Sequence, residues 1–385
     1  RFEDLPPGEY TVRISATGFA EACSRVTVRV SSVRQINVTL QPKGIAEKVV
    51  VNAATQSITT EPIDTGSAVH QAIVYQADLQ NLPLAARSFA NIAYLAPGTE
   101  PVEPSDPTKA RITAVSTGGS SGLNNEISVD GGDNSDDYIG GFLQNFSPDA
   151  IQEFAFRTAL AEADTGRTTA GSVIITTRSG SNLWHGEAAF YERAAALNAR
   201  FPIDNPAPDP KQPFSRQNYV GTLGGPVVSD KLWFFSSIEY VHENSSIAYS
   251  PASTEQFNAL RQLAGMGLVP GVGAIAVPST VLVPFRDYLG TLRLDWAPSE
   301  RSRWFLRAAT DSYTTHNGLV QQGALPSTGA TQHNNYFSFV LGQQTTFSPQ
   351  WFGSLVLNSS LLHLTQTRND TLGFALAFPF TTTSS

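Results

Sequence analysis

Residues 336–367 read YFSFVLGQQTTFSPQWFGSLVLNSSLLHLTQT, two long alternating runs joined at Ser348-Pro349-Gln350. Phe337, Phe339 and Leu341 alternate with small or polar residues in the first run. A period of two is typical of β-strands that have one apolar and one polar face. Strands of soluble domains usually have about 5–6 residues. Because these runs are about twice as long, a membrane-spanning barrel wall is favoured over a soluble all-β domain.

The same pattern recurs upstream, so the C-terminal half is predicted to form about seven antiparallel strands. Leu294 and Trp296 lie on one face of one such run, and Arg293 and Asp295 on the other. The five tryptophans fall at or near strand ends, where membrane proteins place aromatic girdles. A plugged barrel needs about 22 strands, so residues 183–385 are expected to be only the start of one. The expected strands are 184–193, 216–225, 232–242, 286–296, 304–313, 336–347 and 351–367.

The N-terminal residues 1–41 are predicted to be the C-terminal part of a small β-sandwich. Alternating residues at 10–14, 26–30 and 36–40 indicate three strands. Residues 42–54 are predicted to be a linker that contains the β-prone run 46–53. Unpaired backbone groups in such a run can add an edge strand to a partner's sheet. The same run could equally be the first strand of the next domain or a tether.

The middle of the chain, residues 55–182, is predicted to be a compact α+β domain. Residues 73–98 have a helical pattern that ends at Pro97-Gly98. Residues 125–134 are expected to be a strand entering a tight turn, and 149–154 a short helix or the start of a strand. Ser172–Thr177 is expected to be a buried strand. The predicted fold class is therefore mainly β, with an α+β domain between a partial β-sandwich and a large β-barrel.

Composition excludes several classes of protein. The 385 residues are 41% hydrophobic and 15% charged, which is typical of turn-rich β structure and argues against disorder. A net charge of -8 without a basic cluster argues against nucleic acid as a partner. The single Cys23 cannot form an internal disulfide. The sequence has no run of about 18 apolar residues, so no transmembrane helix is expected.

No catalytic site, metal site or cofactor is predicted. Residues 118–122 match G-x-S-x-G but lack the preceding strand and following helix of a nucleophile elbow. Acidic residues at 130, 133, 136 and 137 lack the spacing of a calcium loop, and a hydrogen-bonded turn is the favoured interpretation. The six histidines are scattered. We therefore expect that the protein is not an enzyme.

The middle of the chain resembles the plug of TonB-dependent receptors, in particular the Oar-like branch of Gram-negative bacteria. The resemblance rests on the order and spacing of short motifs between residues 82 and 235. It extends to residues 2–40, where LPPGEY and Gly18-Phe19 resemble a carboxypeptidase-regulatory-like domain. The matching plug motifs are LPL at 82–84 with Arg87, LAPG at 95–98, ISVDGGDN at 127–134, AIQEF at 150–154, GRTTAG at 166–171 and TRSGSN at 177–182.

This resemblance implies a plug inside an outer-membrane barrel, with the N-terminal region in the periplasm. It implies binding of an extracellular ligand, whose identity the sequence leaves unknown, and import driven by the periplasmic domain of TonB. Outer-membrane lipid is the other implied partner. The run Glu47, Lys48, Val49, Val50 and Val51 resembles a TonB box.

Physical reasons support a structural role for the plug motifs. Gly131 and Gly132 allow a turn that a Cβ would obstruct, and Gly166 and Gly171 allow close approach to the wall. Arg167 is suited to a buried ion pair. The predicted structural motif of the plug consists of Asp130, Gly131, Gly132, Asp133, Asn134, Gly166, Arg167 and Gly171. Two other hypotheses remain: an outer-membrane surface binding or assembly protein without active transport, and a soluble β-rich enzyme.

Overall fold

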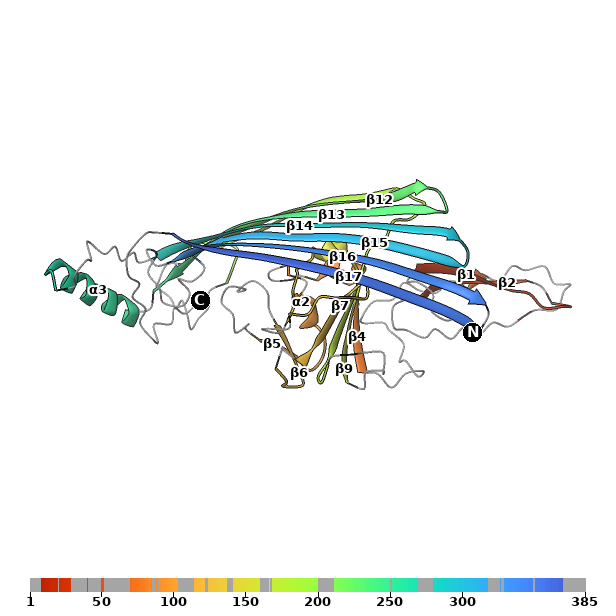
Figure 1. Ribbon diagram of the computed structural model, residues 1–385, viewed down its shortest axis with the longest axis horizontal. Coiled ribbons are helices and arrows are strands. Elements are labelled where there is room, and N and C mark those ends of the chain that lie inside the picture. The colour runs from red at the N-terminus through yellow and green to blue at the C-terminus, as the bar shows by residue number, and fades with distance from the viewer. Residues whose placement is uncertain are drawn as a thin grey trace.

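The computed structural model contains four sheets and few helices (Figure 1). It describes residues 8–19, 21–28, 40, 50–51, 70–82, 84, 87–88, 90–102, 114–121, 124–136, 141–159, 166, 168–199, 211–249, 251–268, 280–317, 326, 329–348 and 350–369. For some of these residues only the backbone is described. Among the described residues, no helix is both long enough and apolar enough to span a membrane.

The N-terminal sheet has three strands in the order β1-β2-β3. Strand β1 (Gly8–Ile14) pairs antiparallel with β2 (Ala22–Val28), and the two-residue β3 (Val50–Val51) pairs parallel with β2. The first two predicted strands are confirmed. The third, at 36–40, lies outside the described residues except for Leu40.

A central unit, residues 70–182, contains a five-stranded sheet in the order β4-β9-β10-β7-β8. Its other strands, β5 and β6, pair with each other. The elements are β4 (His70–Tyr75), α1 (Gln76–Asn81), α2 (Ala90–Ala93), β5 (Thr99–Val102), β6 (Ala114–Thr117), β7 (Glu126–Val129), β8 (Gly132–Asp133), a 3-10 turn (Pro148–Ala150), β9 (Ile151–Ala159) and β10 (Ser172–Thr177).

The sequence prediction for the central unit is right for β7 and β10 and partly wrong for 73–98. Ile73 to Tyr75 end strand β4, which pairs with β9, and in the described part of 76–98 only two short helices follow. Tertiary pairing overrides the helical periodicity here, because Ile73, Val74 and Tyr75 are buried within a sheet. Strands β7, β9 and β10 contribute the apolar core of the unit, with Val129, Phe154 and Ile175 fully buried.

The long sheet contains seven strands, each paired antiparallel with the next along the chain. All seven predicted strands are confirmed, and most extend further than predicted. Such a sheet fits part of a barrel. The strands are β11 (His185–Ala194), β12 (Ser215–Val228), β13 (Leu232–Ala248), β14 (Thr280–Ser299), β15 (Ser302–His316), β16 (Ala330–Ser348) and β17 (Trp351–Arg368).

The two ends of the long sheet differ in the length of their connections. Turns of two or three residues join β12 to β13, β14 to β15 and β16 to β17. Much longer segments join the strands at the other end, and one of them contains α3 (Pro251–Gly265). The N-terminal sheet lies near the short-turn end (Figure 1), where Arg303 donates a hydrogen bond to the Tyr10 hydroxyl over 3.5 Å.

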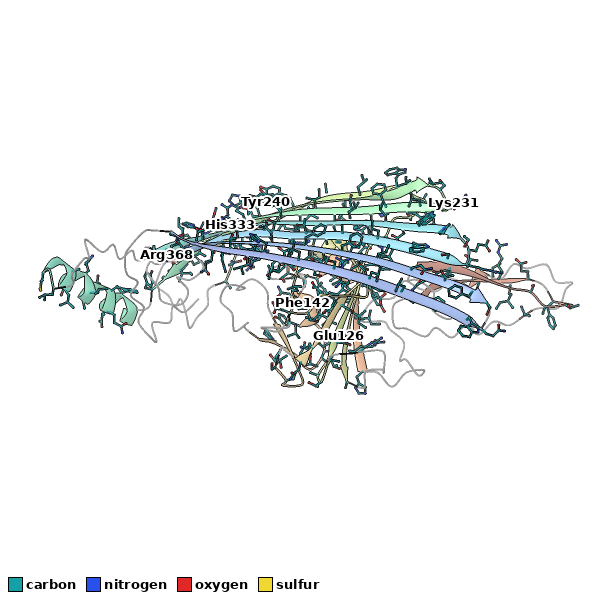
Figure 2. The ribbon with its side chains drawn as sticks, viewed as in Figure 1. Glu126, Phe142, Lys231, Tyr240, His333 and Arg368 are labelled. Carbon is teal, nitrogen blue, oxygen red and sulfur yellow. The ribbon has the colours of Figure 1, made fainter. Side chains whose placement is uncertain are left out.

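The two faces of the long sheet have opposite chemistry. On the outer face, Ile238, Tyr288, Leu292 and Phe337 are about half exposed or more. The inner face packs on the central unit, which lies against it (Figure 2), and carries buried polar and charged residues. Direct cross-strand partners share a face, so exposed apolar side chains line the outer face, whereas buried polar residues lie among apolar ones such as Phe235 and Val340 on the inner face.

Candidate functional site

The central unit contacts the inner face of the long sheet through three polar clusters. The first is centred on Asp130, at the end of β7. Asp130 Oδ1 lies 2.8 Å from Arg293 Nη1, and Asp130 Oδ2 lies 3.1 Å from Arg307 Nε. All three side chains are at most 11% exposed. A charge buried to this extent requires a partner, and the carboxylate supplies one for both guanidinium groups.

The sheet register explains why one carboxylate serves two arginines. Arg293 of β14 and Arg307 of β15 are direct cross-strand partners, so two like charges lie side by side on the inner face. Asp295 also pairs with Arg293, at 3.0 Å, and Ser338 accepts a hydrogen bond from Arg307 at 2.9 Å. Asp130 therefore joins the central unit to a pair of cations that would otherwise repel each other.

The turn after β7 brings the backbone of the central unit against the wall. Asp130 and Gly131 have φ values of 52° and 77°, a region that glycine adopts readily and other residues rarely do. A Cβ added at Gly132 would lie 2.6 Å from Val340 Cγ2 and 2.8 Å from Asn358 Oδ1, on β16 and β17. Only glycine fits here without displacing the wall.

The rest of the ISVDGGDN motif holds the turn and the segment that follows it. Asp133 Oδ1 accepts a hydrogen bond from the backbone N–H of Ser135 at 2.9 Å. The Asn134 side chain exchanges two hydrogen bonds with the Gln144 backbone, at 3.0 and 3.1 Å. Thr177 donates two further bonds to the Asp130 carboxylate. The predicted motif residues 130–134 thus converge on one junction with the wall.

Two other predicted glycines have different surroundings from those expected. A Cβ at Gly171 would meet Arg157 O and Thr117 Oγ1, both at 2.9 Å and both inside the central unit. A Cβ at Gly166 would meet nothing within 4 Å. The expected approach of these glycines to the wall is therefore wrong, and Gly132 makes that approach instead. Arg167 lies outside the described residues.

The second cluster is centred on Arg87, in the connection between α1 and α2. Its Nη2 lies 2.5 Å from Asp149 Oδ2, and its guanidinium lies 3.5 Å from the centre of the Tyr191 ring on β11. Its Nε is 3.9 Å from Glu239 of β13. Arg87 has a positive φ of 51°, which is uncommon for a residue with a Cβ. The contact with the wall thus holds a locally strained backbone.

Glu239 is the part of this cluster that sequence reasoning missed. It is 1% exposed and accepts hydrogen bonds of 2.5 Å from the Ser147 hydroxyl of the central unit and the Asn218 amide of β12. One sequence signal could have indicated it: Glu239 is a glutamate on the polar face of a strand whose other face is apolar.

Arg178 belongs to the same cluster. It donates a hydrogen bond to Asp149 O at 3.1 Å, and burial lowers the pKa of its guanidinium.

The third cluster is a pair of carboxyl groups on the inner face. Asp287 of β14 and Asp311 of β15 are at most 4% exposed and lie diagonally opposite each other on neighbouring strands. Asp311 Oδ2 also accepts a hydrogen bond from the backbone N–H of Asn145 at 2.8 Å. Two buried carboxyl groups that lie close together disfavour the ionisation of both at once. The pair therefore forms a third link between the wall and the central unit.

Of the five predicted coupling residues, two lie in the described part of the chain. Glu47, Lys48 and Val49 lie outside the described residues, whereas Val50 and Val51 form β3 and pair with Cys23 and Ser24 of β2. Within the described residues, no group of three or more histidine, cysteine or acidic side chains is placed to hold a metal ion. Asp137 of the acidic series is outside them.

Comparison with known proteins agrees with this architecture. Residues 176–280 match the family model of the outer membrane beta barrel domain, and residues 1–44 match the PEGA domain model. The chain is 30% identical over 249 residues to the TonB-dependent transporter Oar of Myxococcus xanthus. The match covers 61% of this chain but only 22% of Oar, so the similarity to a TonB-dependent transporter extends over part of each protein.

Solved structures show the same fold. The outer membrane transporter YddB of Escherichia coli superposes with a TM-score of 0.53 at 9% identity, over 76% of this chain and 38% of YddB. The siderophore receptor PirA of Acinetobacter baumannii gives 0.52 at 15% identity, over 77% and 40%. Together with the family-model match at residues 176–280, this shared fold indicates that the long sheet is part of an outer-membrane barrel.

Proposed function

We propose that this receptor binds an extracellular ligand and imports it into the periplasm with energy transmitted by TonB. In this proposal residues 55–182 are a plug, residues 183–385 begin the barrel, and residues 1–41 form a periplasmic regulatory-like domain. The protein then supplies binding and gating and no bond chemistry. Support comes from the similarity to a TonB-dependent transporter and from the fold that the chain shares with an outer membrane transporter.

The observation that carries the proposal is the link from Asp130 to Arg293 and Arg307. Two wall cations and one carboxylate of the central unit form a buried contact between two separate bodies. Such a contact is strong while intact, and water can solvate its groups after separation. A plug that must hold a barrel closed and later move requires an interface of this kind.

The position of the N-terminal region supports the direction of energy transfer. Short turns of outer-membrane barrels face the periplasm and long loops face outward. The N-terminal sheet and the candidate coupling residues Val50 and Val51 lie near the short-turn end (Figure 1). Residues 47–51 would therefore reach a periplasmic partner, to which strand addition could transmit a pull.

The test uses the full-length protein and a purified TonB periplasmic domain. Proline at Val49 and Val51 removes backbone N–H groups and blocks strand pairing, whereas threonine at both positions preserves it. We expect the proline variant to lose TonB binding and ligand-dependent growth while ligand binding at the cell surface is retained. The threonine variant should behave like wild type.

Unchanged growth and TonB binding in the proline variant would sink the transport proposal. In that case the same barrel would act as a surface binding or assembly protein without active transport. Correct insertion of each variant is checked by the change in electrophoretic mobility after boiling in detergent.

A further inference from the structure

Two aromatic rows define the apolar band on the outer face of the long sheet. Phe190, Tyr219, Tyr240 and Tyr288 are successive cross-strand partners, with ring centres 5.1, 6.2 and 4.6 Å apart. Nearer the short turns, Trp296 and Trp304 are also cross-strand partners, with ring centres 6.5 Å apart. Aromatic girdles mark the two membrane interfaces of such barrels.

The spacing of the rows is close to the height of the apolar band of outer-membrane barrels, about 25 Å. From Tyr288 to Trp296, β14 advances eight residues, which is about 27 Å along the strand and about 20 Å across the membrane after the usual tilt. On the far side of the tyrosine row, the next outward-facing row contains His242, Arg286 and His333. The outer face therefore changes from apolar to polar at the tyrosine row, and the tryptophan row marks the periplasmic interface.

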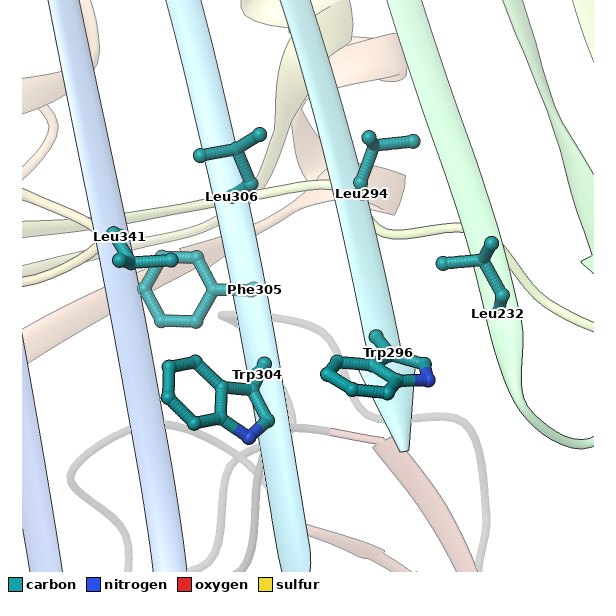
Figure 3. Close-up of a pocket in the computed structure, with 7 residues that line it drawn as sticks. All are labelled: Leu232, Leu294, Trp296, Trp304, Phe305, Leu306 and Leu341. Carbon is teal, nitrogen blue, oxygen red and sulfur yellow. The ribbon is translucent and has the colours of Figure 1, made fainter. Parts of the chain in front are cut away.

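An apolar groove of about 390 Å³ lies on the outer face at the periplasmic edge of this band (Figure 3). Leu294, Leu306 and Leu341 are cross-strand neighbours and form its floor, one row further from the strand ends than the tryptophans. The remaining lining includes Leu232, Trp296 and Trp304. The groove opens to the hydrocarbon of the periplasmic leaflet.

The turns beside the groove carry both signs of charge. Lys231 directly precedes the groove residue Leu232, and its carbonyl accepts a hydrogen bond from the Ala297 N–H at 2.7 Å, which holds two hairpin ends together. Arg301 and Glu300 form the turn that follows β14, and all three side chains are exposed. Cations suit a phosphate and a carboxylate suits an ammonium group, so the set complements a zwitterionic phospholipid head.

We propose that this groove is a binding site for one phospholipid with a phosphoethanolamine head. An acyl chain lies along Leu294, Leu306 and Leu341, beside the two indole rings. The phosphate lies between Lys231 and Arg301, and the ammonium group faces Glu300. The site requires only the outer-membrane location of the chain and does not depend on TonB-driven transport.

Native mass spectrometry of the full-length protein, purified in detergent with added dioleoyl-phosphatidylethanolamine, tests the site. Leu306→Phe fills the floor of the groove, while Leu361→Phe makes the same change on the outer face of β17, where Leu361 is 66% exposed. We expect one retained lipid in wild type and in Leu361→Phe, and at least a tenfold lower occupancy in Leu306→Phe.

A second arm tests the head group. The double variant Lys231→Gln, Arg301→Gln is expected to lower retention of the phosphatidylethanolamine at least fivefold while the apolar groove is intact. Equal retention in wild type and Leu306→Phe would mean boundary lipid only and would overturn the site. Equal retention in the double variant would overturn the assigned position of the phosphate. The mobility shift on boiling verifies that each variant forms its barrel.

Discussion

Asp130 Oδ2 lies 3.1 Å from Arg307 Nε, and the two side chains are 1% and 2% exposed. This pair joins the turn after β7 to the inner face of β15. Because Arg293 binds the other carboxylate oxygen and also pairs with Asp295, the contact contains two positive charges and two negative charges. The seating of the central unit against the wall depends on this small set of charges.

Asp130→Ala should loosen the central unit. The substitution leaves Arg307 without an acid and Arg293 with only Asp295, and an uncompensated buried charge typically costs about 3–5 kcal/mol. We expect faster proteolysis between residues 70 and 182 in membranes, together with a lower unfolding midpoint of the intact protein. Asp133→Ala is the matched control, because Asp133 is exposed and its carboxylate accepts a hydrogen bond from Ser135 in its own turn.

Digestion of the Asp130→Ala and Asp133→Ala variants at the same rate would show that the ion pairs of Asp130 do not hold the central unit against the wall. A double-mutant cycle with Arg307→Met separates the pair from the general effect of mutation. The coupling energy should exceed about 1 kcal/mol, since the two groups are in direct contact.

Gly132→Ala should weaken the contact between the central unit and the wall, because the added methyl group collides with wall side chains. The added methyl group would lie 2.6 Å from Val340 Cγ2 and 2.8 Å from Asn358 Oδ1. Overpacking of this kind typically costs about 1–3 kcal/mol. The midpoint of thermal unfolding should fall, and Val340→Ala should restore part of it by making room.

The control for this steric argument is Gly221→Ala on β12. A Cβ at that position meets nothing within 4 Å, and the backbone there has no positive φ. If Gly132→Ala had a thermal unfolding midpoint as high as that of Gly221→Ala, the wall side chains would have moved to accept the methyl group. That result would contradict a tight contact between Gly132 and the wall.

Asp287→Asn should be tolerated better than Asp287→Ala. The amide can donate to the Asp311 carboxylate without a shared proton, so Asp311 remains ionised and still accepts from the Asn145 N–H. Alanine leaves the Asp311 carboxylate buried with only that one bond. We expect Asn to equal or exceed wild type in unfolding midpoint and Ala to fall below it. The opposite order would mean that the carboxyl pair does not share a proton.

Alternation and motif order predicted most of the wall and part of the contact site. The seven strands could be placed because period-two patterns over long runs need no tertiary information. Asp130 and the adjacent glycines were found because a short acidic turn with two glycines is a local signal. Glu239, Asp287 and Asp311 were not found, since their importance comes from the register between strands far apart in the chain. The helical pattern at 73–98 failed at Ile73 to Tyr75 because pairing with β9 decides the structure there.

Glu239→Gln tests whether Arg87 links the two bodies or only the central unit to itself. Arg87 has a close acid in its own unit, Asp149 at 2.5 Å, and a distant one on the wall, Glu239 at 3.9 Å. Glutamine removes the charge; its amide oxygen can still accept from Asn218, and its NH2 group can donate to the Ser147 hydroxyl oxygen. Because the Asp149 pair and the Tyr191 stacking persist, we expect Glu239→Gln to lower the free energy of unfolding by only about 1 kcal/mol.

Arg87→Lys removes the planar stacking on Tyr191 and should lower the free energy of unfolding further, since lysine does not replace a stacked guanidinium. Unfolding midpoints of both variants and of their combination supply the measurement. A larger loss in Glu239→Gln than in Arg87→Lys would assign the main attachment to the wall glutamate instead of the ring contact on β11.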